Sequence, residues 1–115
     1  MFHVISSAEQ QRFPNRTVKF EGEDYGSNVS FFLIDNEPGE CLGLHVHPYP
    51  ETWIVRGGEA EFTVGRDTVR AAVGDIIVCP AQLPHRFENV GTGRLELVCI
   101  HASDRIIQDW VDAPA

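Results

Sequence analysis

The chain has 115 residues, of which 43% are hydrophobic, and a formal net charge of −8 at pH 7. This length favours one domain with a single core, and the acidic balance argues against a nucleic-acid partner, which would require a basic surface. No run approaches the roughly 20 apolar residues of a membrane span, so we expect no membrane contact.

From Thr17 onward, short runs rich in β-branched and aromatic residues alternate with turn residues at close spacing. This pattern is typical of an antiparallel sandwich or barrel, and helical periodicity is nearly absent. Strands are predicted over residues 17–21, 29–34, 41–47, 52–56, 59–64, 68–72, 76–79, 85–89 and 95–101. The breaks between them hold glycine, proline, asparagine or aspartate, which tolerate tight turns.

The strand at 41–47 and the turn after it carry the strongest chemical signal. His45 and His47 are two residues apart, so on a strand their side chains project from the same face. The sequence Pro-Tyr-Pro that follows favours a turn, because each proline removes a backbone donor and fixes φ. This turn brings Glu51 back alongside the histidine pair, so two imidazoles and a carboxylate are expected to meet.

A second cluster follows the strand at 76–79. Pro80 and Pro84 bracket a turn that ends at His85, which supplies a fourth ligand. Mixed imidazole and carboxylate ligands suit Fe(II), Mn(II), Ni(II), Co(II) or Zn(II), and four of them leave an octahedral ion open to substrate. The predicted ligands of one divalent transition metal are therefore His45, His47, Glu51 and His85.

The two clusters resemble the two sequence motifs of the cupin family. Residues 39–58 follow the first motif, Gly-x5-His-x-His-x3-Glu-x6-Gly, without a mismatch. Residues 74–89 follow the second, Gly-x5-Pro-x-Gly-x2-His-x3-Asn, except that Gln82 stands where the motif has a glycine able to adopt positive φ. The resemblance implies a single cupin domain over residues 1–115, an antiparallel double-stranded β-helix or jelly-roll barrel, and it favours iron or manganese.

Strand alternation also predicts the walls of the metal site. If the strands are regular, the side chains that share the ligand face are Cys41, Trp53, Val55 and Phe87. These walls are mostly apolar, which favours a compact organic molecule over a sugar, although core packing is the alternative role of the aromatic residues. Tyr49 lies beside the ligands and is a weak candidate for a proton donor. His101 faces the interior by parity, but nothing in its spacing links it to a metal.

The three cysteines are odd in number, widely spaced and without a Cys-x-x-Cys pair. This usage favours free, buried thiols in a reducing compartment. The first residues of the chain also lack the basic and apolar regions of a secretory signal. We therefore expect a cytoplasmic protein.

The tail differs from the rest of the chain. Ser103 and Asp104 are suitable N-caps. The apolar residues that gather on one side at helical spacing are Ile106, Ile107, Trp110 and Val111. These residues predict one short C-terminal helix, either as a lid over the end of the barrel or as a dimer contact.

Two classes of function remain open. An open metal centre predicts an enzyme, either a dioxygenase or other oxidoreductase, or else an isomerase or decarboxylase. The other class is a non-catalytic module whose ion or pocket holds a small effector, since a fold does not specify chemistry. A homodimer is expected, because single-barrel cupins commonly pair and the strand at 29–34 carries apolar residues on both faces.

Overall fold

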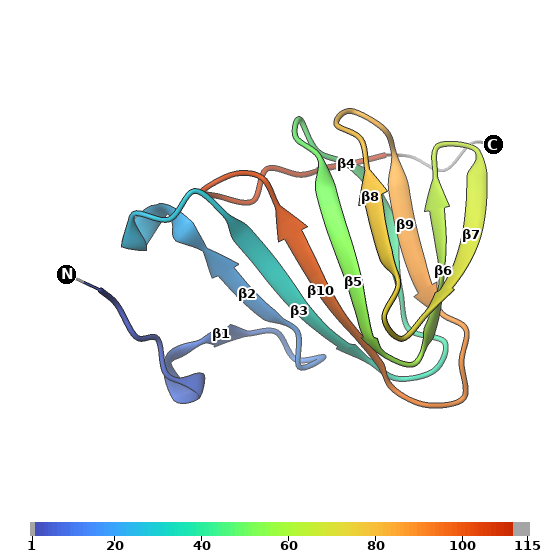
Figure 1. Ribbon diagram of the computed structural model, residues 1–115, viewed down its shortest axis with the longest axis horizontal. Helices are drawn as coiled ribbons and strands as arrows, with labels where there is room; N and C mark the ends of the chain where they lie inside the picture. The colour runs from blue at the N-terminus through green and yellow to red at the C-terminus, as the bar shows by residue number, and fades with distance from the viewer. Residues whose placement is uncertain (1, 112–115) are drawn as a thin grey trace.

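In the computed structural model, which describes residues 2–111, two antiparallel β-sheets pack face to face (Figure 1). The six-stranded sheet has the order β1 (Gln11–Arg12), β2 (Val18–Glu21), β3 (Ser30–Asn36), β10 (Leu95–His101), β5 (Glu51–Gly57) and β8 (Ile76–Cys79). The five-stranded sheet has the order β11 (Asp109–Trp110), β4 (Cys41–Val46), β9 (His85–Asn89), β6 (Glu59–Val64) and β7 (Asp67–Ala72). Two short 3-10 turns complete the elements, η1 (Ser7–Glu9) and η2 (Gly22–Tyr25).

The predicted all-β jelly-roll architecture is confirmed. Each predicted strand is present, from β2 to β10, with ends within one or two residues of the expected positions. Alternation along β5, β9 and β10 turns one set of side chains into the space between the sheets, where they form the core. Its largest fully buried members are Trp53, Phe62, Leu95 and Leu97. Within residues 2–111, no helix combines the length and apolar character that a membrane crossing needs.

Strand direction brings the functional residues to one end of the barrel. His45 pairs with His85 across β4 and β9, and Glu51 pairs with His101 across β5 and β10. Both pairs lie at strand ends, and their side chains are buried between the two sheets. Segments far apart in the sequence therefore meet inside one end of the barrel.

A β-bulge interrupts β4. Leu42 pairs with Phe87 and His45 pairs with His85, so three steps along β4 match two steps along β9. The extra residue reverses the alternation, and Leu42 faces the core cluster while Cys41 is exposed. The prediction that Cys41 shares the face of His45 assumed a regular strand. Because of the bulge, Cys41 and His45 do not share a face.

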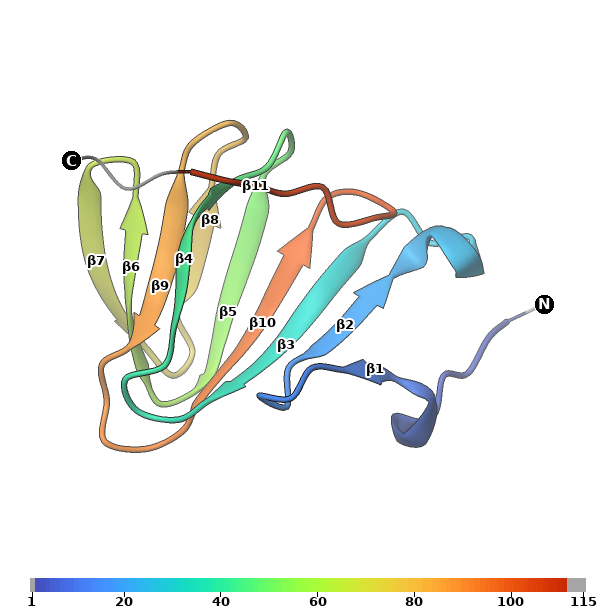
Figure 2. The same ribbon diagram turned by 180° about the vertical axis from the view of Figure 1, so that it is seen from behind.

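The predicted C-terminal helix is wrong. Residues 102–108 form bends and extended chain, followed by the two-residue strand β11, which pairs with β4. Figure 2 shows this dark red segment running across the upper end of the barrel, where β11 lies beside the end of β4. Two backbone N–H groups of the segment bond to residues far away in the sequence instead of to the preceding turn of a helix. The Ile106 N–H donates to Glu21 Oε2 at 2.9 Å and the Ile107 N–H to the Tyr49 hydroxyl at 3.1 Å. Tertiary hydrogen bonds thus outweigh the helical spacing of the side chains.

Candidate metal centre

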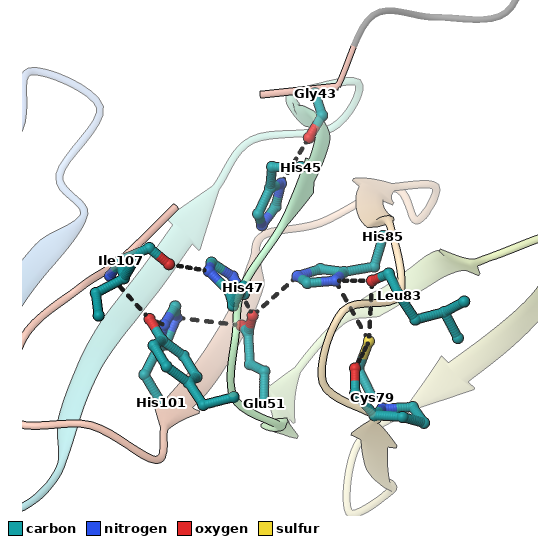
Figure 3. Close-up of polar contacts among 11 residues, drawn as sticks. Gly43, His45, His47, Glu51, Cys79, Leu83, His85, His101 and Ile107 are labelled. Atoms are coloured by element: carbon teal, nitrogen blue, oxygen red, sulfur yellow. Dashed lines mark hydrogen bonds and ion pairs between the residues drawn. The ribbon is translucent and has the colours of Figure 1, made fainter. Parts of the chain in front are cut away.

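Four buried side chains lie close together at one end of the core (Figure 3). One ligand atom from each of them lies within 4.8 Å of the ligand atoms of the others. They come from the end of β4, the turn behind it, and the first residues of β5 and β9. The four are His45, His47, Glu51 and His85, the same residues that the sequence predicts as ligands.

Each of the three imidazoles is held by its Nδ1 atom. The N–H at this position donates to a backbone carbonyl: His45 to Gly43 at 2.7 Å, His47 to Ile107 at 2.7 Å and His85 to Leu83 at 2.9 Å. A hydrogen bond at Nδ1 fixes both the ring orientation and the tautomer, and leaves the Nε2 lone pair free. All three rings are thus prepared to ligate through Nε2.

The donor set fits a cation. His47 Nε2 is buried and has no hydrogen-bond partner within residues 2–111, although it lies 3.0 Å from Glu51 Oε1. His85 Nε2 lies 3.1 Å from the same oxygen. Electron-rich nitrogen and oxygen atoms at this distance repel each other unless a positive charge lies between them. A divalent transition metal meets that need with ligands of the appropriate type.

The charges of the ion-free cluster follow from its contacts. Burial by itself raises the pKa of Glu51, but contacts with three imidazoles, first that of His101, lower it well below its ordinary value. Burial lowers the pKa of His85, but contacts with the Cys79 thiol and Glu51 raise it above its ordinary value overall. Burial lowers the pKa of His45 to about 4. These shifts favour a protonated His85 beside the Glu51 anion when no ion is bound.

His101 and Tyr49 complete the cluster. The Tyr49 hydroxyl and His101 Nδ1 are 2.6 Å apart, and His101 Nε2 lies 3.5 Å from Glu51 Oε2. Sequence spacing gave no reason to link His101 to the metal site. The signal that would have found it is strand pairing, because β10 places His101 directly opposite Glu51. Burial raises the pKa of Tyr49 to about 12, and the hydroxyl is hydrogen-bonded to His101 and to the Ile107 N–H. Both effects disfavour transfer of its proton to a substrate.

The predicted wall residues lie in two places. Trp53 and Val55 are fully buried in the core, with the Trp53 ring edge-on to His85 at 5.2 Å between centroids. Phe87 and Cys41 border a cavity of about 210 Å³ between the two sheets, which Phe32 and Trp110 also line. These two aromatic rings in turn contact His101 and His45. The cavity therefore adjoins the ligand cluster.

Comparison with known proteins agrees with this geometry. The family model of the cupin domain matches residues 32–101. The chain belongs to the cupin family. The second motif of this cupin departs from the pattern at Gln82, which adopts the φ of +66° that a glycine takes at little cost. The turn before His85 is thus kept despite the substitution.

Several curated proteins are similar to this cupin. Mannose-1-phosphate guanylyltransferase 2 of Escherichia coli O157:H7 is 32% identical over 92 residues, which cover 79% of this chain and 19% of that protein. Xanthan biosynthesis protein XanB of Xanthomonas campestris pv. campestris is 29% identical over 91 residues, which cover 78% of this chain and 20% of that protein. The chain thus spans about a fifth of the length of these relatives.

Solved structures show the same fold. Oxalate decarboxylase from Bacillus subtilis, in its structure at pH 4.6, superposes with a TM-score of 0.79 at 23% identity, over 90% of this chain and 30% of that chain. A second structure of the same enzyme, from a study of its Mn(II) centres, superposes with a TM-score of 0.77 at 22% identity, over 88% of this chain and 29% of that chain. At 22% to 23% identity, this likeness is evidence for a shared fold alone.

Proposed function

We propose that the protein is a metal-dependent oxidoreductase of the dioxygenase type that acts on a compact organic molecule. The observation that carries this proposal is the convergence of three Nδ1-anchored imidazoles and one carboxylate, His45, His47, His85 and Glu51, on one point beside a cavity. Four protein ligands leave positions of a six-coordinate ion open to a substrate. When bound, the ion supplies Lewis acidity and electron-transfer chemistry.

The surroundings of the site favour oxidation over proton transfer. An isomerase needs a protein group that takes and returns a proton. Tyr49 is the candidate nearest to the ligands, but its hydroxyl donates to His101 and accepts from Ile107. Among the buried aromatic side chains of the core, Trp53 packs edge-on against the ligand His85. Oxidation by O2 would rely on the redox chemistry of the bound ion, so it fits a site in which no proton-transfer residue is identified.

The cavity indicates the kind of substrate. Phe32, Phe87 and Trp110 make its walls largely apolar, and Asn36 and Gln108 add uncharged polar groups. No lysine or arginine of the described residues lines it. A phosphorylated sugar of the kind named for the guanylyltransferase relatives, or a small dianion such as oxalate, calls for a basic partner. A compact aromatic or aliphatic compound suits these walls better. Manganese and iron are the favoured ions, in keeping with the Mn(II) centres of the structurally similar decarboxylase.

The test is oxygen consumption by protein loaded with a single metal. Metal-free protein is reconstituted with Fe(II), Mn(II), Ni(II) or Zn(II), and O2 uptake is followed against a panel of phenols, thiols and small acids. We expect uptake that needs both a redox-active ion and one class of compound, and that is lost in the Glu51→Gln variant. His3→Ala serves as the matched control, since His3 is exposed and outside the cluster.

The same experiment separates the two functional classes. Compounds that bind to the metal-loaded protein, for example by calorimetry, without any O2 uptake or turnover would favour the non-catalytic effector module. Turnover with release of CO2 and without O2 uptake would favour the decarboxylase alternative instead.

A further inference from the structure

A fourth histidine lies behind the carboxylate of the metal centre. His101 is 1% exposed and stands opposite Glu51 in the pairing of β10 with β5. Its Nε2 faces Glu51 Oε2 at 3.5 Å, whereas the ligands His47 and His85 face the other oxygen, Oε1, at 3.0 and 3.1 Å. The two oxygens of one carboxylate thus have different partners, one on the side of the ion and one on the side of His101.

The orientation of His101 is determined by its own hydrogen bonds. The Tyr49 hydroxyl accepts the Ile107 N–H at 3.1 Å, so its proton is free to point at His101 Nδ1, 2.6 Å away. An imidazole that accepts at Nδ1 carries its hydrogen at Nε2. The edge-on contact with Phe32, at 5.4 Å between ring centroids, also limits rotation of the ring. A neutral His101 therefore presents an N–H to Glu51 Oε2.

We propose that His101, oriented by Tyr49, is a positioning residue that keeps Glu51 a one-oxygen ligand of the ion. This inference rests on the proposed function, because it concerns the same metal centre. A carboxylate binds a metal through one oxygen or both, and the second oxygen fills an additional coordination position. The N–H dipole of His101 retains Oε2 on its own side. The position that Oε2 would otherwise occupy stays open to water or substrate.

The test counts the water molecules on a bound probe ion. The 115-residue chain is loaded with Mn(II). The number of rapidly exchanging waters is measured by water-proton relaxation, with the electron paramagnetic resonance spectrum as a second readout. Wild-type protein is expected to hold about two waters, the positions that four single-atom ligands leave on a six-coordinate ion. His101→Leu, which has no N–H, is expected to hold about one fewer and to give an altered spectrum.

Two further variants separate positioning from simple packing. His101→Gln keeps an N–H donor and is expected to restore the wild-type water number and spectrum. Tyr49→Phe keeps His101 but removes the hydroxyl that orients it, and is expected to lie between wild type and His101→Leu. Cys99→Ala is the matched control, since Cys99 is buried on the same face of β10 as His101 and is paired with Trp53 instead of with a ligand. It is expected to leave both readouts unchanged.

The outcomes distinguish this inference from the proposed function. Equal water numbers and spectra in wild type, His101→Leu and Tyr49→Phe would overturn the role of His101 while leaving the metal enzyme intact. The same loss of water in His101→Gln as in His101→Leu would also overturn it. If wild type binds Mn(II) but oxidises no compound, the proposed oxidoreductase function is wrong. A loss of one water in His101→Leu would still support the inference about His101. Failure of wild type to bind any ion would overturn both.

Discussion

His47 and Ile107 are 60 residues apart in the sequence and are joined by a hydrogen bond of 2.7 Å, from the imidazole Nδ1 to the backbone carbonyl. The N–H of the same residue, Ile107, donates to the Tyr49 hydroxyl. The C-terminal segment therefore supports a metal ligand directly, through its peptide groups. Orientation by such outer contacts typically changes metal affinity by about 10- to 100-fold.

Removal of this segment is expected to weaken metal binding. A chain that ends at Asp104 lacks the carbonyl that orients His47, so its dissociation constant for Mn(II) should rise by about tenfold or more. Calorimetric titration measures the change, and circular dichroism verifies that the sheets persist. Ile107→Ala is the control, because it keeps both peptide groups and should bind as wild type does. Equal affinity of the shortened chain and wild type would contradict the role of the segment.

Loss of any ligand should empty the site. His47→Ala and His85→Ala each remove a nitrogen donor, and Glu51→Gln removes the one anionic donor. We expect the metal content after dialysis, measured by elemental analysis, to fall to near zero in each variant, while His3→Ala retains the wild-type content. If His47→Ala and His85→Ala both kept their metal, the three-histidine site would be wrong.

Metal binding should release a proton. The raised pKa of His85 means that this ring is protonated in the ion-free protein near neutral pH, whereas the lowered pKa of His45, about 4, means that this ring is already neutral. An ion must therefore displace the proton of His85, and affinity should increase as pH rises. Titration calorimetry in buffers of different ionisation enthalpy should show release of about one proton per ion. A binding heat that is independent of the buffer would refute this.

The ion-free protein should lose stability as pH rises above neutrality. Folding raises the pKa of His85 from 6.5. Such a histidine contributes stability that is fully present below its unfolded pKa and is lost as the pH rises toward its folded pKa. His45 is neutral in both states in this range, so it does not oppose the effect. We expect a lower Tm at about pH 8 than at about pH 7 in the presence of chelator, and a smaller difference in His85→Asn. A rising Tm in wild type would show that the Glu51 and His85 ion pair is absent.

The turn before His85 carries strain that a glycine relieves. Gln82 has φ +66°, a left-handed conformation that costs a residue with a Cβ about 1–2 kcal/mol. Its N–H donates to the His47 carbonyl at 2.8 Å, so the conformation is held in place. Gln82→Gly should raise the free energy of unfolding by about 1 kcal/mol, measured by urea denaturation. Gln82→Ala keeps the Cβ and should bring no gain; equal effects of the two substitutions would exclude strain as the cause.

Local sequence patterns predicted most of the sheet structure. Alternation of apolar and polar residues with glycine and proline between the runs placed the strands from β2 to β10. The two-residue strands β1 and β11 were missed, because two residues are too few to show a period and both strands form by pairing with a neighbour. The predicted helix failed for a related reason, since its backbone groups bond to Glu21 and Tyr49, which the local sequence does not reveal.

The ligand set was predicted because motif spacing records it directly. The remaining parts of the site depend on three-dimensional pairing. His101 joins the cluster through its place opposite Glu51, and Cys41 leaves the ligand face through a bulge, and neither event has a local signature. The homodimer stays a prediction. The outer side of β8 is relevant to it, since Ile76 and Val78 are 65% and 64% exposed there.

The irregularity of β4 has a consequence for redesign of the backbone. The additional residue between Leu42 and His45 interrupts the pairing of β4 with β9. At this place the Gly43 carbonyl accepts a hydrogen bond from the His45 ring. An engineer who deleted that residue to obtain an ideal strand would keep the imidazole pointing inward and lose its anchor. A regular β4 would therefore come with weaker affinity for the ion.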